Sequence, residues 1–218
     1  MKVLHFRKKD FKIIAAALEV AEDLTANFYK FSTSEWKNKH KYDLKTLIAL
    51  NRHQVINNAF ALLCRDTIKV NSIPQRITGV YLICLQDHVI LKTLLRDRNL
   101  SLFPFLVYIL THELVHIVRF CNYYAHFNAS QSAKVQEEIT VNAITFDILK
   151  SVMIPNLSYV LNLFCKNNLV TQQQTAKKSV LVFGAGAMDG QKPPGGADHP
   201  EKAEYKYPTQ NCTLVQFC

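Results

Sequence analysis

The chain has 218 residues, 26 Lys and Arg against 17 Asp and Glu, and 49% hydrophobic residues. This composition excludes a disordered or collagen-like chain, and the length suits one domain with a buried core. The net charge of +9 is compatible with a nucleic-acid partner, but the basic residues are spread along the chain, so this partner has only weak support.

The sequence predicts neither a signal peptide nor a transmembrane segment. The basic start is not followed by an apolar stretch, and the longest apolar run, 102–110, is half the length of about 20 residues that a membrane span needs. The six cysteines form no C-x-x-C pair. We therefore expect free thiols, a reducing compartment and a cytoplasmic location.

Three segments of the first half show regular patterns. Apolar residues from Phe11 to Phe28 recur at steps of three and four, which predicts a first amphipathic helix. Apolar residues between 44 and 63 predict a second, long helix. The β-branched and aromatic run 77–85 predicts a strand, and we expect a partner strand near 88–91.

Two further helices are predicted downstream. The third covers about 104–120 with Pro104 in its first turn, where a missing N–H costs nothing, and the fourth covers about 132–151 and ends before Pro155. The fold class is therefore α+β, a mainly helical body with a small β-sheet.

Glycine and proline divide the chain into two parts. Five of the six glycines lie in 184–196, and four of the seven prolines lie between 193 and 208. We therefore expect a body at 1–165 and a loosely structured or disordered tail at 166–218. The sequence leaves open whether this tail adds a strand or lies over the body.

The third helix carries the motif His112-Glu113-Leu114-Val115-His116. Two histidines at positions i and i+4 share one helix face, so both rings can reach one metal ion at about 2.0–2.1 Å. Glu113 lies beside the first histidine and can take a proton from metal-bound water without binding the metal itself. Apart from these three, residues 105–118 are uncharged, which predicts a helix buried on nearly all sides.

A catalytic zinc ion needs a third protein ligand. Glu137 and Glu138 lie on the fourth helix, 21 and 22 residues after His116, where a helix folding back on the third can present a carboxylate. We prefer Glu138, because it shares a face with Asn142 and Thr145 and so has a more polar surrounding. Glu137 remains the alternative, and His126 is a weaker candidate.

This arrangement resembles the gluzincin group of zinc metallopeptidases, over residues 105–149. The resemblance implies a zincin-like body in which zinc is bound by His112, His116 and Glu138, with Glu113 as general base. It also implies that Asn142 orients a ligand histidine, although gluzincins commonly have aspartate there, and that the strand 77–85 is an edge strand that aligns the substrate.

From these residues we expect a hydrolase that cleaves a peptide bond of a peptide or protein substrate through metal-activated water. The group that stabilises the oxyanion is open among Arg119, Tyr123, Tyr124 and His126. The alternative is a non-catalytic regulatory or nucleic-acid-associated binding protein whose motif holds a structural metal or none. The sequence does not indicate an oligomeric state.

Overall fold

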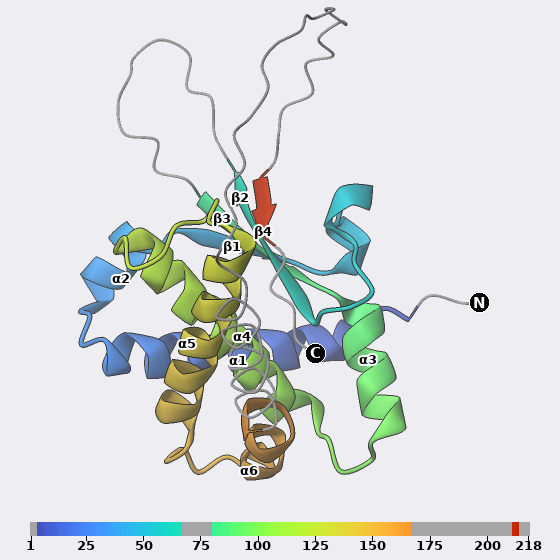
Figure 1. Ribbon diagram of the computed structural model, residues 1–218. Helices are drawn as coiled ribbons and strands as arrows, with labels where there is room; N and C mark the ends of the chain where they lie inside the picture. The colour runs from blue at the N-terminus through green and yellow to red at the C-terminus, as the bar shows by residue number, and fades with distance from the viewer. Residues whose placement is uncertain (1–3, 67–79, 167–210, 214–218) are drawn as a thin grey trace, which may run out of the picture.

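The computed structural model describes residues 4–66, 80–166 and 211–213. Within them the chain forms an α+β fold in which helices predominate (Figure 1). The helices are α1 (Lys8–Phe28), α2 (Thr33–Lys39), α3 (Asp87–Arg96), α4 (Leu102–Cys121), α5 (Gln131–Leu149) and α6 (Leu157–Val160), with the short turns η1 (Leu47–Ala49), η2 (Arg52–Gln54) and η3 (Leu161–Lys166). The strands are β1 (Tyr42–Lys45), β2 (Ala61–Asp66), β3 (Val80–Leu85) and β4 (Asn211–Thr213).

The strands form one mixed sheet in the order β1-β3-β2-β4. β1 is parallel to β3, whereas β2 is antiparallel to both β3 and β4. Side chains alternate between the two faces: Leu63 and Ile83 belong to the main core, and Leu62 and Cys84 to a smaller cluster on the other face. Figure 1 shows α1, α4 and α5 together on one side of this sheet.

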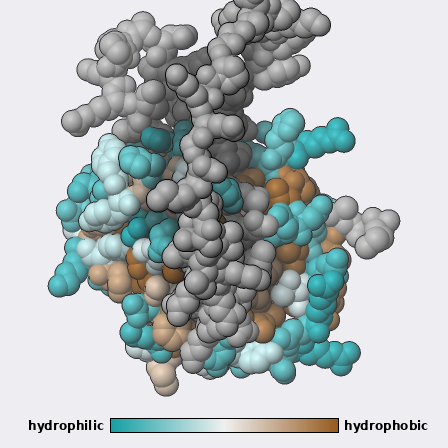
Figure 2. Space-filling model, in the orientation of Figure 1, coloured by the Kyte–Doolittle hydropathy of each residue, from teal (hydrophilic) through white to brown (hydrophobic). Residues whose placement is uncertain are grey.

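α4 is the central helix of the core, and α1 and α5 both pack against it. Every side chain from Pro104 to Val118 is buried, as the nearly uncharged sequence predicts. By length and composition α4 could also cross a membrane, but 83% of its most apolar window is buried inside the fold. A buried core helix passes the same test, so this is weak evidence for a span. On the face shown in Figure 2, hydrophilic side chains are spread around the periphery.

The structure confirms three of the predicted helices, at α1, α4 and α5, and the predicted strand at β3. The predicted second helix is wrong, because residues 44–63 contribute to β1, η1, η2 and β2. The partner strand expected near 88–91 is also wrong, since this segment lies in α3. Short apolar runs do not distinguish a buried strand from a buried helix, which explains both errors.

Two other expectations change. β3 lies between β1 and β2, so it is a central strand rather than the edge strand that the resemblance implies. Cys64 is disulfide-bonded, against the expectation of free thiols, whereas Cys84 and Cys121 are free. The expected tail, 166–218, lies outside the described residues except for Lys166, at the end of η3, and β4.

Two buried polar side chains connect the loop before β2 to the start of α3. Asp87 accepts hydrogen bonds from the backbone N–H groups of Phe6 at 3.0 Å and Leu47 at 2.9 Å. Gln86 accepts one from the N–H of Ile56 and donates to the carbonyl oxygen of Gln54. These bonds link three separate segments in the interior, where an unpaired polar group would cost about 1–3 kcal/mol.

Candidate metal centre

The histidine pair and one glutamate meet between α4 and α5. His112 and His116 lie one turn apart on α4, and their Nε2 atoms are 3.1 Å apart. Glu138 on α5 places one oxygen 3.4 Å from Nε2 of His112 and the other 3.2 Å from Nε2 of His116. Both histidines are buried and the Glu138 side chain is 14% exposed.

These distances suit a tetrahedral ion. With bonds of about 2.0–2.1 Å, two ligand atoms of a tetrahedral zinc ion lie about 3.4 Å apart. Two imidazoles and one carboxylate are a donor set that zinc accepts, and three protein ligands leave a fourth position open. The residues present therefore fit the metal that the sequence predicts.

Polar atoms around the three side chains are buried without a partner among the described residues. They are Oγ1 of Thr111, both carboxylate oxygens of Glu113, Nδ1 of His116, Oδ1 of Asn142 and Oγ1 of Thr145. Buried polar groups in folded proteins are nearly always hydrogen-bonded, to protein or to ordered water or ions. These atoms lie on α4 and α5, the two helices that carry the histidines and Glu138, and water or an ion is the kind of partner that could satisfy them.

The electrostatics of the three side chains are coupled. Burial lowers the pKa of His112 to about 4, against the effect of its hydrogen bond with Glu138. Burial alone would lower the pKa of His116, but the Glu138 carboxylate outweighs it and raises this pKa. Burial opposes ionisation of Glu138, yet the two histidines hold its pKa down at about 2. The metal-free chain thus carries neutral His112 beside a paired His116 and Glu138, and neutral imidazole is the metal-binding form.

Glu113 follows His112 on α4 and is fully buried. Burial raises the pKa of its carboxyl group to about 8, with His116 opposing this shift. A carboxyl group whose pKa lies near neutrality can both accept and release a proton, which is the property of a general base.

Glu137 has a different environment from its neighbour. Its two oxygens accept hydrogen bonds from Nε and Nη2 of Arg119, at 2.6 and 2.8 Å. This bidentate pair is partly buried, with 15% of Arg119 and 12% of Glu137 exposed. Glu137 is therefore occupied by Arg119, while Glu138 faces the histidines.

Asn142 is buried on α5, one turn beyond Glu138. Neither its Oδ1 atom nor Nδ1 of His116 has a hydrogen-bond partner among the described residues. Its role in orienting a ligand histidine stays a prediction.

A cavity of about 340 Å³ opens beside the centre, and both His116 and Glu138 line it. Of the four oxyanion candidates, Arg119, Tyr124 and His126 line this cavity, whereas Tyr123 is 85% exposed and does not. Glu113 is not among the lining residues. His126 lies on the wall of the cavity and outside the group of converging donor atoms.

The aromatic side chains that line this cavity were not predicted from the sequence. Phe120 stacks on the ring of His116 with 5.8 Å between centroids, and Phe127 meets Phe120 at 5.3 Å. The spacing of four residues between His116 and Phe120 places them on one face of α4 and could have indicated this contact.

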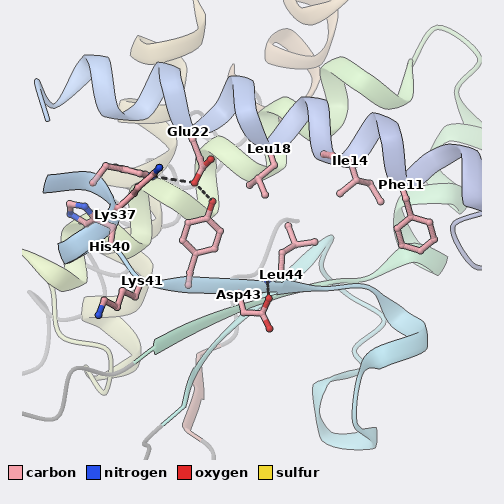
Figure 3. Close-up of a pocket in the computed structure, with 12 residues that line it drawn as sticks. Phe11, Ile14, Leu18, Glu22, Lys37, His40, Lys41, Asp43 and Leu44 are labelled. Carbon is pink, nitrogen blue, oxygen red and sulfur yellow. Dashed lines mark hydrogen bonds between the residues drawn. The ribbon is translucent and has the colours of Figure 1, made fainter. Parts of the chain in front are cut away.

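A larger cavity of about 560 Å³ lies between α1 and β1 (Figure 3). Phe11, Ile14 and Leu18 point from α1 toward β1, and the Glu22 carboxylate accepts hydrogen bonds from Trp36 at 3.2 Å and Tyr42 at 2.6 Å. Its lining residues include none of His112, His116 and Glu138. We therefore place the candidate chemistry at the smaller cavity.

No protein-family model matches the chain, and no curated protein or solved structure matches it. What defines the class of this protein is thus its own fold and site: an α+β body with a His-His-Glu group at metal-binding distances, between α4 and α5.

Proposed function

We propose that the chain is a zinc-dependent peptidase in which His112, His116 and Glu138 hold the metal and Glu113 is the general base. The observation that carries this proposal is the convergence of His112, His116 and Glu138, whose possible ligand atoms all lie within 4.8 Å of one another, next to a buried carboxylate and beside a cavity. Glycine-poor, tightly packed helices hold the donors, and rigid elements position a site more precisely than loops do.

Bound zinc would polarise the carbonyl group of the peptide bond and lower the pKa of water. Glu113 would accept a proton at its carboxylate and return it to the leaving amine, which its freedom from hydrogen bonds with the described residues leaves it able to do. Burial of both histidines keeps bulk water from competing for their nitrogen atoms.

One observation favours the alternative of a non-catalytic protein with a structural metal site. Glu113 is fully buried and does not line the cavity, so a substrate entering there meets His116 and Glu138 before it meets the base. In that case the zinc-loaded protein would cleave no peptide. A binding protein of the nucleic-acid-associated kind would also retard nucleic acid at moderate salt.

Metal analysis and a cleavage assay test the proposal together. The purified chain should hold about one zinc ion by native mass measurement, and the zinc-loaded chain should cleave members of a mixed peptide library. A chelator should abolish cleavage, and added zinc should restore it. A chain that holds no zinc after reloading, or holds zinc without cleaving any peptide, would contradict the peptidase function.

A further inference from the structure

β1 forms one edge of the sheet. It is the first strand in the order β1-β3-β2-β4, and among the described residues it pairs only with β3. In a parallel pair, alternate residues turn both backbone groups toward the same neighbour, and the carbonyl oxygen of Lys41 accepts the N–H of Tyr81 at 3.1 Å. Tyr42 and Leu44 therefore turn their N–H and C=O groups away from β3. An edge of this kind is a template for another strand.

The side chains of β1 distinguish its two faces. Figure 3 shows Leu44 pointing toward α1 and Asp43 pointing away from it. Because side chains alternate along a strand, Lys45 lies on the same face as Asp43. The N–H of Leu44 donates to Oδ1 of Asp43 at 2.8 Å, which agrees with a backbone group that faces the edge rather than β3. The edge thus carries one acidic and one basic side chain on the face opposite to α1.

The cavity of about 560 Å³ between α1 and β1 adjoins this edge (Figure 3). Its lining is mixed, with apolar Phe11, Ile14 and Leu18 from α1, and with Glu22 and Lys37 nearer α2. Phe11 is 44% exposed although it is apolar. A strand added to β1 would direct every second side chain toward α1, where these apolar residues lie.

We propose that the edge of β1 pairs with β1 of a second copy of this chain, antiparallel about a two-fold axis at Leu44. A two-fold interface must be complementary to itself. An axis at Leu44 places each Asp43 directly opposite Lys45 of the other copy, which makes two pairs of opposite charge on one face of the joined sheet. An axis at Asp43 would instead place the two Asp43 carboxylates opposite each other, and like charges in such positions are destabilising.

The backbone fits the same register. At the axis, the Leu44 N–H of each copy donates to the Leu44 carbonyl oxygen of the other, as in a hydrogen-bonded pair of an antiparallel ladder. This bond replaces the one from Leu44 to Asp43, and the Asp43 carboxylate is released toward Lys45 of the other copy. The strand has only four residues, so we expect a dimer that dissociates on dilution. None of the candidate metal ligands lies on β1, so this inference does not depend on the proposed function.

Charge reversal tests the interface. In Asp43→Lys two lysines face each other in both pairs, and in Lys45→Asp two aspartates do, so the dissociation constant of each variant should rise at least about tenfold. A mixture of the two variants restores opposite charges in both pairs and should form a mixed dimer about as readily as the unchanged chain forms its own. Asp147→Lys, at an exposed position of α5, changes the net charge as Asp43→Lys does and should leave the dimer intact.

The measurement is sedimentation velocity of the full chain over a dilution series, with native mass spectrometry of the mixture after isotope labelling of one variant. The unchanged chain should show a concentration-dependent dimer, and the mixture should contain mainly the mixed dimer. A monomer at every concentration would overturn the proposal and leave an extended segment of another protein as the occupant of this edge. A dimer that withstands both reversals, or a mixture that dissociates as the single variants do, would overturn it as well.

Discussion

Replacing Glu138 by alanine should remove most of the stability that zinc adds to this protein. The Glu138 carboxylate lies 3.4 Å from Nε2 of His112 and 3.2 Å from Nε2 of His116, so it completes the set of three donors. Without it the two histidines alone would hold the ion. Metal binding stabilises only the folded chain, because the unfolded chain does not assemble the site.

The expected loss of stability follows from the linkage between zinc binding and folding. At a free zinc concentration a thousandfold above Kd, bound metal stabilises the fold by about 4.1 kcal/mol. Loss of a residue that merely supports a ligand weakens binding about 10–100-fold, so loss of a ligand should weaken it at least about 100-fold. The same free zinc concentration is then only about tenfold above the Kd of the variant, and bound metal stabilises its fold by only about 1.4 kcal/mol. The difference of about 2.7 kcal/mol corresponds to about 5–11 °C in Tm for a domain of this size.

Glu137→Ala is the matched control, because it removes the adjacent carboxylate. It breaks the bidentate pair with Arg119 and should cost about 1–3 kcal/mol with or without zinc. The assay is thermal unfolding of each protein at buffered free zinc and with excess chelator, and the quantity compared is the Tm difference between the two conditions. A zinc-dependent Tm gain that survives Glu138→Ala, or disappears in Glu137→Ala, would refute the assignment of the third ligand.

Three further predictions concern other side chains. Glu113→Gln should retain zinc and the fold but reduce peptide cleavage by about 10²–10⁴-fold in kcat, and full activity in this variant would exclude Glu113 as the base. Asp87→Ala should lower the free energy of unfolding in urea by about 2–4 kcal/mol, because the N–H groups of Phe6 and Leu47 lose their acceptor, whereas exposed Asp43→Ala should change it little. Burial lowers the pKa of His40, so the unfolded chain binds a proton more readily than the folded chain, and the free energy of unfolding should fall as the pH drops below about 6.5. In His40→Phe the new ring can keep the contacts with Phe31 and Trp36. Urea unfolding at pH 7.5 and 5.5 should therefore show a smaller loss of stability between the two pH values in this variant than in the unchanged protein.

Long helices with a strong pattern could be predicted from the sequence, and the sheet could not. α4 follows from the long run 105–118, in which His112, Glu113 and His116 are the only ionisable residues apart from Tyr108, and a buried helix is the element that such a run predicts. β2 is buried by pairing with β3 on one side and β4 on the other, and β4 comes from residues 211–213. Nothing in the local spacing of residues 61–66 indicates partners so distant in sequence, so its apolar residues were attributed to a helix.

The histidine pair and its facing helix could likewise be predicted, because positions i and i+4 of one helix share a face wherever that helix lies. The environments of Glu137 and Glu138 needed the structure. The sequence places Glu137 on the more apolar face of α5, yet Asn142 and Thr145, on the face of Glu138, are more deeply buried than Ile144. The inner face of α5 is thus partly polar where it meets the histidines. The positions of the apolar residues alone therefore do not predict correctly which face of α5 is turned toward them.

The position of Glu113 bears on how the site could work. Residues i and i+1 of a helix do not share a face, so a helix that directs His112 and His116 at Glu138 must direct Glu113 elsewhere. Glu113 is accordingly absent from the wall of the cavity that His116 and Glu138 line. A peptide bound in that cavity would therefore have to reach the metal from one side and the base from another. This geometry makes the Glu113→Gln assay the measurement that separates a catalytic metal centre from a structural one.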